Sequence, residues 1–243
     1  MIGLSVSPMT LTVRRTPMPL STINPLVWYD ATTAGTLWQD TGATVPVSAS
    51  GNPVRRIDAA IGAKPLVIRN AASPASRSTG VSFGGSGIDM AATLAIPASH
   101  AVIMAARIDN WTAAHADLFC PHGTNAYGLR AGSTSEFLAK INSSNLGLSE
   151  LSSGADRSGL HVFATVFDAS TGTASIRIDG TTVASASGYN GALDASTVLK
   201  IFGSRWNSAS VTGELFGLGV LSSAELAKVS AAETHLKALI PAV

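Results

Sequence analysis

The 243-residue chain has little charge and almost no cysteine. Only 13% of its residues are charged, and 16 basic residues against 15 acidic ones give a formal net charge of +1. Nucleic-acid-binding proteins usually carry a clustered basic excess, which is missing here, so no nucleic-acid partner is expected. The single cysteine, Cys120, excludes an intrachain disulfide. Its expected role is that of a small buried residue in a strand.

Long hydrophobic runs are also missing. A membrane span needs about 18 or more consecutive apolar residues, and the best stretch, residues 91–106, is interrupted by Pro97 and His100. We therefore expect no membrane insertion. The chain starts without the basic segment of a secretion signal, which favours a product made and kept in a cytoplasm. Hydrophobic residues still make up 46% of the chain, enough for one core without a metal or disulfide.

Short runs that alternate apolar with polar residues recur about every 10 residues, as in a β-sandwich or barrel. The clearest expected strands are residues 26–30, 65–69, 80–83, 101–105, 160–167, 174–178 and 198–202. Residues 160–167 are apolar at most positions, which predicts a central strand. Asp179-Gly180 suits a two-residue type I′ hairpin turn. Residues 160–167, residues 174–178 and the strand after the turn are therefore predicted to form an antiparallel meander.

The two ends of the chain differ from this β pattern. Ser222-Ser-Ala-Glu225 matches a capping box, and apolar residues then recur at helical spacing until Pro241. This predicts one amphipathic helix over residues 222–240. Four prolines precede residue 26 and disfavour both helix and central strand. Residues 1–25 are therefore interpreted as an extended N-terminal arm.

Several segments carry a family resemblance. They are Leu26-Val-Trp-Tyr-Asp-Ala31, Trp38-Gln-Asp-Thr-Gly42, Phe83-Gly-Gly-Ser-Gly-Ile-Asp-Met90, Ile176-Arg-Ile-Asp-Gly180 and Leu215-Phe-Gly-Leu-Gly-Val-Leu-Ser-Ser-Ala-Glu225. In this order they resemble the concanavalin A-like lectin/glucanase superfamily, in the laminin-G-like form found in bacteriophage virion proteins. Gly84, Gly87 and Ile88 depart from it, since the family pattern has acidic residues there. The resemblance implies an all-β, antiparallel two-sheet jelly-roll sandwich over residues 26–243.

Such a fold carries lectins, hydrolases and inert structural modules alike, so function depends on particular residues. The glucanases of the superfamily that this chain resembles carry the pattern Glu-x-Asp-x-x-Glu on one strand. None of the glutamates begins that pattern; they are Glu136, Glu150, Glu214, Glu225 and Glu233. The histidines lack metal-ligand spacing, and the nearest approach to a calcium site is Asp109, Asn110 and Asp117. We expect no catalytic residue, no metal and no cofactor.

Binding residues are expected on loops, because sugars stack on aromatic rings beside polar side chains that a rigid sheet presents. Trp28 and Trp38 lie in core motifs of the resembled family and are interpreted as structural. The candidate ligand-binding residues are Trp111, Trp206, Arg205, Asn207, Tyr189 and Asn125.

Two main hypotheses follow. The first is a non-enzymatic bacteriophage virion structural protein, a capsid decoration, fibre or tail-associated subunit, because an arm precedes a weakly charged sandwich. Its partners would be other virion subunits, bound through residues 1–25, and further copies of itself, with a homotrimer as one form. It would be assembled in the host cytoplasm. The alternative is a carbohydrate-binding module that recognises host-surface glycans. A glycan hydrolase is disfavoured by the missing carboxylate pattern.

Overall fold

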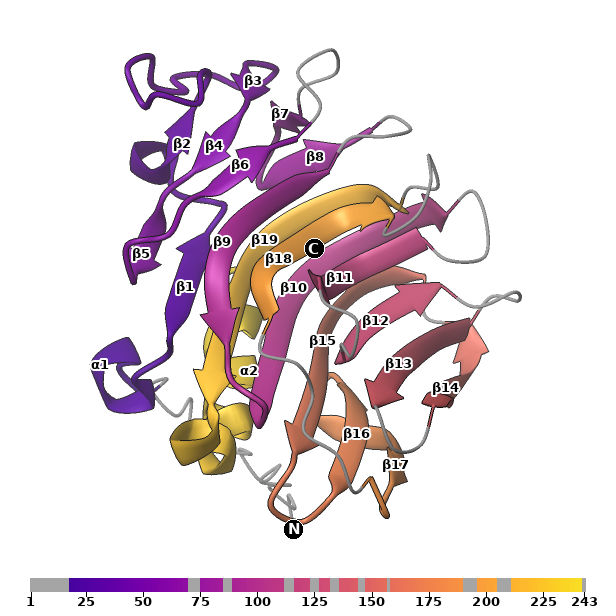
Figure 1. Ribbon diagram of the computed structural model, residues 1–243. Coiled ribbons are helices and arrows are strands. Elements are labelled where there is room, and N and C mark those ends of the chain that lie inside the picture. The colour runs from indigo at the N-terminus through magenta and orange to yellow at the C-terminus, as the bar shows by residue number, and fades with distance from the viewer. Residues whose placement is uncertain are drawn as a thin grey trace, which may run out of the picture.

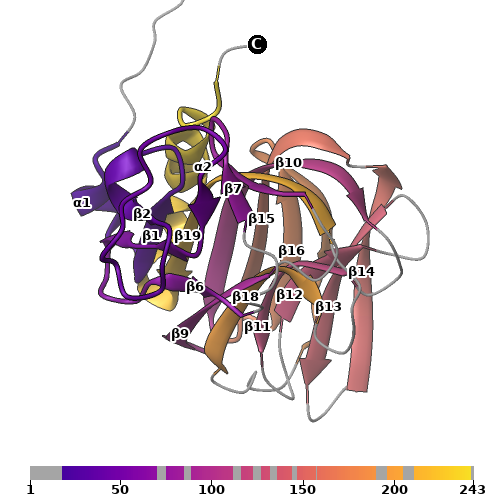
Figure 2. The ribbon, with the colours of Figure 1, turned by 90° about the horizontal axis from the view of Figure 1, so that it is seen from above.

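The computed structural model describes residues 18–69, 75–84, 89–111, 116–122, 127–131, 136–143, 147–156, 158–189, 196–204 and 211–241. Within these ranges the strands form two antiparallel sheets, which stack as two layers (Figure 1, Figure 2). The predicted all-β, two-sheet sandwich is confirmed.

The sheet that carries the predicted meander is called sheet A. Its main order is β17 (Thr181–Ala186), β16 (Thr173–Ile178), β15 (Gly159–Asp168), β10 (His100–Trp111), β19 (Val211–Ser222), β8 (Val81–Phe83), β7 (Ala75–Arg77) and β3 (Pro53–Val54). Two further strands belong to it: β1 (Val27–Asp30) pairs with β19, and β5 (Ala59–Ile61) pairs with β1.

The facing sheet is called sheet B. Its order is β14 (Gly147–Asp156), β13 (Glu136–Ser143), β12 (Tyr127–Ala131), β11 (Ala116–His122), β18 (Ser196–Ser204), β9 (Met90–Ile96), β6 (Leu66–Ile68), β4 (Arg56–Ile57) and β2 (Leu37–Trp38). The helical segments are α1 (Leu20–Ile23), η1 (Ala34–Thr36), η2 (Ser223–Lys228) and α2 (Val229–Lys237). No described helix is long and apolar enough to cross a membrane.

The strand β10 shows why the middle of sheet A is apolar at nearly every position. Val102 and Met104 point into the core between the sheets, while Ala101, Ile103 and Ala105 point the other way, into a second core. The helix α2 covers that second core, on the side of sheet A away from sheet B (Figure 2). A strand buried on both faces has no solvated side to mark with polar residues.

The predicted meander is confirmed. The strands β15, β16 and β17 pair consecutively, and β15 lies between β16 and β10 inside sheet A. Asp179 and Gly180 both have positive φ, 51° and 84°, as a type I′ turn requires. Cys120 is fully buried in β11, as expected of a small residue in a strand.

The N-terminal arm needs a correction, because part of it is helical. Residues 20–23 form α1, in which Pro19 accepts hydrogen bonds from the backbone N–H groups of Thr22 and Ile23. A proline at this boundary lacks only an N–H that the first turn does not use. Ile23 is fully buried in the core beneath α2, so burial overrides the extended tendency of the prolines. Residues 1–17 lie outside the described residues.

The C-terminal helical segment is found, but its predicted cap is wrong. It begins as the 3-10 turn η2 and continues as α2, and Ser222 makes no side-chain cap hydrogen bond. Glu225 instead accepts a hydrogen bond from Asn24 Nδ2 at 3.2 Å and pairs with Lys228. These bonds lower the pKa of Glu225, with Lys228 the larger cause. The carboxylate therefore fastens the end of α1 to η2, a tertiary contact that the local motif could not reveal.

Candidate functional site

The outer face of sheet B is a broad sheet surface without a helical layer in the described part of the chain. The helices α2 and η2 lie against β10, β15 and β19 of sheet A. Figure 2 shows α2 on one side of the sandwich and β9, β11 and β18 of sheet B on the other. Ligand sites are often built on such surfaces, because a rigid sheet fixes the side chains that it presents.

Strand pairing aligns one row of residues across this face. Residues that are direct partners in an antiparallel sheet point to the same side. The aligned residues, called here the outer row, are Trp38, Arg56, Val67, Ala91, Lys200 and Cys120. Their sequence neighbours Leu37, Ile57 and Ile201 lie in the core between the sheets, so the row points outward. With strands about 4.8 Å apart, its backbone spans about 24 Å.

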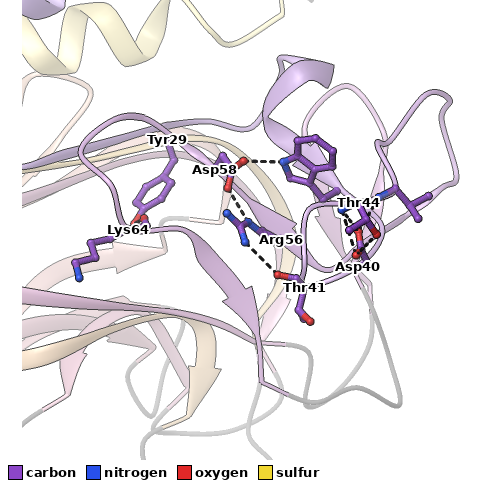
Figure 3. Close-up of polar contacts among 9 residues, drawn as sticks. Tyr29, Asp40, Thr41, Thr44, Arg56, Asp58 and Lys64 are labelled. Carbon is purple, nitrogen blue, oxygen red and sulfur yellow. Dashed lines mark hydrogen bonds and ion pairs between the residues drawn. The ribbon is translucent and has the colours of Figure 1, made fainter.

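Trp38 lies at one end of the outer row and is partly exposed. Its indole Nε1 donates a hydrogen bond to Asp58 Oδ2 at 2.8 Å. The other oxygen of Asp58 accepts from Arg56 Nε at 2.7 Å, and Arg56 Nη1 donates to the Thr41 carbonyl at 3.1 Å (Figure 3). This chain of bonds fixes an aromatic ring beside a guanidinium and a carboxylate.

The turn after Trp38 is held by Asp40. Its carboxylate accepts hydrogen bonds from the backbone N–H groups of Thr44 and Val45 and from the Thr44 hydroxyl (Figure 3). These bonds lower the pKa of Asp40, with the Val45 N–H the largest cause and the Thr44 hydroxyl next. The turn returns the chain so that Pro46 bridges to Trp38. The predicted Trp-x-Asp turn thus supports the position of the indole.

Tyr29, in the same region, gives the fold a dependence on alkaline pH. Its hydroxyl is buried and donates to the Lys64 carbonyl at 2.6 Å (Figure 3). Burial raises the pKa of Tyr29 well above its usual value near 10. Below about pH 10 the neutral phenol contributes its full stabilisation. As the pH rises further this stabilisation is lost, because the Tyr29 hydroxyl ionises at a lower pH in the unfolded chain than in the folded one.

We expect Tyr29→Phe to weaken that alkaline dependence. Urea unfolding at several values between about pH 8 and 11 would test it. The variant should be less stable at pH 8, because the Lys64 carbonyl loses its donor, yet should lose less stability than the wild type as the pH rises. Equal pH slopes for the two proteins would contradict the assignment.

Lys200 lies near the other end of the outer row. Its side chain is on the outer face, since Leu199 and Ile201 point into the core, yet the residue is only 6% exposed. The negative charges of Asp89 and Asp117 lie near enough to favour its ammonium form. Burial lowers the pKa of Lys200, and the positive charge of Arg69 lowers it further. The carboxylates nearby do not offset this loss of solvation.

Asp89 and Asp117 are the nearby carboxylates, and both are buried. Arg69 Nη1 donates to Asp89 Oδ2 at 2.7 Å. Asp89 packs so closely on Gly203 that a Cβ added there would lie 2.6 Å from Asp89 Cβ. The glycine is therefore required to seat Asp89 beside β18.

A hollow of about 240 Å³ lies between α2 and the β16–β17 turn. Asp179 and Glu233 both line it. Burial alone would raise the pKa of Asp179, but hydrogen bonds from the Val162 N–H and from His161 outweigh it and the pKa is lowered. Glu233 pairs with Arg177 through both of its oxygens, at 2.9 and 2.8 Å. The contacts of Asp179 thus favour its ionised form, and Glu233 is engaged by Arg177.

The residues predicted to bind ligand lie in several places. Trp206, Arg205, Asn207 and Asn125 lie outside the described residues. Trp111 ends β10, with its backbone paired to Val211. Tyr189 is 8% exposed, and its ring lies 6.4 Å from that of Phe167, centroid to centroid. Their roles in binding stay predictions.

The structure adds Trp38 and Lys200 as candidates. Trp38 was interpreted as structural; its indole is hydrogen-bonded, and the residue is partly exposed. Lys200 could have been noticed in the sequence, since it is a lone charge in the apolar strand at residues 198–202.

The residues nearest to a calcium site in the sequence were Asp109, Asn110 and Asp117. In the structure Asp109 is paired with Arg107. The described residues hold no group of three metal-ligating side chains.

Comparisons with known proteins identify the fold but not a family. No protein-family model matches the chain, and neither does any curated protein. Domain 4 of an extracellular arabinanase from Geobacillus stearothermophilus, solved with arabinotriose, is 14% identical and covers 85% of this chain and 98% of its own, with a TM-score of 0.51.

Two larger proteins are also similar. A Trypanosoma rangeli sialidase in complex with a difluoro-KDN compound is 12% identical, with a TM-score of 0.55 and 87% of this chain covered. The receptor-binding domain of botulinum neurotoxin type G is 9% identical, with a TM-score of 0.54 and 88% covered. This chain spans only 33% of the sialidase and 51% of the neurotoxin domain. At these identities the likeness shows a lectin-like β-sandwich fold.

Proposed function

We propose that the protein is a non-catalytic carbohydrate-binding domain and that sugars bind at the Trp38 end of the outer row of sheet B. The observation that carries the proposal is that Trp38 is partly exposed while its indole is held by Asp58 beside Arg56. Sugars present an apolar face to aromatic rings and hydroxyl groups to charged side chains. The Trp38 group offers both kinds of contact on one rigid edge.

The comparisons support this proposal over a virion role. The arabinanase domain was solved with a bound arabinotriose, and the sialidase with a sugar-like compound. Sugar binding by those proteins makes it a reasonable function for a similar sandwich, although fold alone does not decide function. The bacteriophage structural role expected from sequence finds no support among these neighbours.

Binding without catalysis is proposed because three carboxylates already accept hydrogen bonds from neighbouring side chains or backbone N–H groups. Asp179 and Glu233, which line the hollow beside α2, are both held by cationic or N–H donors. Beside the outer row, Asp58 accepts hydrogen bonds from Trp38 and Arg56 at once. Each of these carboxylates already serves as a hydrogen-bond acceptor, which suits a role in positioning side chains and in accepting from ligand hydroxyl groups.

We expect Trp38→Ala to weaken sugar binding about tenfold or more, the size of an effect worth about 1.4 kcal/mol. The wild-type protein would be applied to an array of neutral and acidic glycans that includes arabinotriose, and each hit measured by calorimetry. Trp38→Phe should retain part of the affinity, since a ring remains but the bond to Asp58 is lost.

Leu26→Ala is the matched control for this experiment, because Leu26 is an exposed apolar residue (37%) outside the outer row. It should bind as the wild type does. Thermal unfolding of all three variants separates loss of fold from loss of contact. An array without any hit would refute the proposed function, and unchanged affinity in a folded Trp38→Ala protein would refute this face as the site.

A further inference from the structure

The hollow between α2 and the β16–β17 turn is a second candidate binding site, separate from the Trp38 group. It has a volume of about 240 Å³ and lies on the side of sheet A that faces away from sheet B, because α2 covers that side. Pockets for drug-sized ligands begin at roughly 300 Å³. The hollow therefore has room for one small molecule.

Arg177 holds the walls of the hollow in place. From β16 it donates to the Gly180 carbonyl at 2.8 Å and to the two oxygens of Glu233 in α2 at 2.9 and 2.8 Å. It also donates to the Ser230 hydroxyl oxygen, on the same helix, at 3.2 Å. One guanidinium thus bonds to both the turn and the helix, which fixes the shape of the hollow. Preorganisation of this kind lowers the entropy cost of binding.

The polar side chains that line the hollow keep bonding capacity for a ligand. Asp179 accepts from the Val162 N–H at 3.0 Å and from His161 Nδ1 at 2.7 Å, and its side chain is 40% exposed. Each carboxylate oxygen has a further lone pair. Thr234 and Lys237 line the hollow from α2, and both are exposed. The hollow thus offers hydrogen-bond donors and acceptors together.

The charges that line the hollow balance one another. Glu233 is paired with Arg177 at 2.8 Å. Lys237 lies close enough to Asp179 for its positive charge to act on that carboxylate. A charged ligand of either sign therefore meets repulsion as well as attraction. Val162, which is almost completely buried, adds an apolar wall. A neutral molecule with several hydroxyl groups and one apolar side fits this combination.

We infer that this hollow binds one neutral sugar residue, with Asp179 and Lys237 bonding its hydroxyl groups and Val162 facing its apolar side. The choice of a sugar over another polyol rests on the proposed function, whereas the neutral, hydroxylated class follows from the hollow itself. The outer row points away from the core of the sandwich on sheet B, and α2 lies beyond sheet A. The two sites therefore lie on opposite faces, and one domain would bind two glycan chains at once.

Nuclear magnetic resonance separates the two sites, because each has its own reporter. The backbone amide signals of Gly180 and Thr234 report on the hollow, and the indole N–H signal of Trp38 reports on the outer row. The ligands are galactose and glucose, each compared with its uronic acid and its amino sugar, which place one charge on a similar ring. A further ligand, myo-inositol, is a neutral polyol that is not a sugar.

We expect the hollow signals of the wild type to move in a saturable way with at least one neutral sugar, with a Kd on the order of 1 mM. The uronic acid and the amino sugar of the same series should each bind about threefold or more weakly. Binding of myo-inositol in the hollow should also be weaker than that of the neutral sugar.

Two variants should shift the preference for charge in opposite directions. Lys237→Met leaves an excess negative charge, so the affinity of the amino sugar relative to the neutral one should rise about threefold or more. Asp179→Asn leaves an excess positive charge and should favour the uronic acid by a similar factor. Asparagine tolerates the positive φ of 51° at this position. Lys64→Met, at an exposed lysine that does not line the hollow, is the matched control and should keep the wild-type preference.

The outcomes separate the two proposals. A response of the Trp38 signal alone would overturn the hollow as a site and leave the proposed function intact. A charged form or myo-inositol that binds in the hollow as tightly as the neutral sugars would overturn the class of ligand. An unchanged preference in folded Lys237→Met and Asp179→Asn proteins would overturn the assigned contacts. A response of the hollow alone would support this inference and count against the outer row, and no response at either site would count against both.

Discussion

Replacing Gly213 with alanine is expected to leave little folded protein. Gly213 lies in β19 between β10 and β8, paired with Ile108 on one side and Phe83 on the other. A Cβ built there would lie 2.0 Å from the Arg107 carbonyl oxygen, which is backbone. Neither neighbouring strand can move away without breaking pairs in the middle of sheet A. We therefore expect a loss of more than about 4 kcal/mol, an unusually large effect for one methyl group.

Gly35→Ala provides the control for this change. No atom lies within 4 Å of the Cβ that it would add, and Gly35 does not have a positive φ. Its effect should stay within about 0.5 kcal/mol. Urea unfolding followed by tryptophan fluorescence compares the two variants, against the 5–15 kcal/mol typical of a natural domain. A Gly213→Ala protein as stable as Gly35→Ala would show that the strands at this point are much less constrained than the structure indicates.

Local sequence patterns predicted the parts of the fold whose contacts are themselves local. The apolar run at residues 160–167 and the Asp179-Gly180 turn were sufficient for the β15–β17 meander, because consecutive strands meet through one short turn. The helical segment after Ser222 was predicted for the same reason. The predicted cap of this segment was wrong, because Glu225 accepts a hydrogen bond from Asn24, a residue distant in sequence.

The candidate site could not be predicted in the same way. Trp38, Arg56 and Lys200 come from β2, β4 and β18, and only the register of a sheet assembled from distant segments aligns them. Exposure also depends on that assembly, so Trp38 could not be distinguished from a core residue such as Trp28. Sequence therefore predicted the kind of scaffold, while the binding face follows from strand order and register.

Arg177→Met is expected to destabilise the protein by about 3–5 kcal/mol. Arg177 on β16 holds Glu233 of α2 through two bonds, and Glu233 is only 4% exposed. Without the guanidinium, this buried carboxylate has no other partner among the described residues. Glu233→Leu should cost less, about 1–3 kcal/mol, because Arg177 retains the Gly180 carbonyl and the Thr182 hydroxyl as acceptors.

The double variant Arg177→Met with Glu233→Leu tests the cause of this loss. If an unpaired buried charge is responsible, the double variant should be more stable than Arg177→Met alone, which gives a favourable coupling energy between the two residues. Lys237→Met, which removes an exposed charge from the same hollow, should change the free energy of unfolding by no more than about 0.5 kcal/mol. Additive effects of the two single changes would mean that the pair does not fasten α2 to sheet A, and that the apolar face of the helix alone does so.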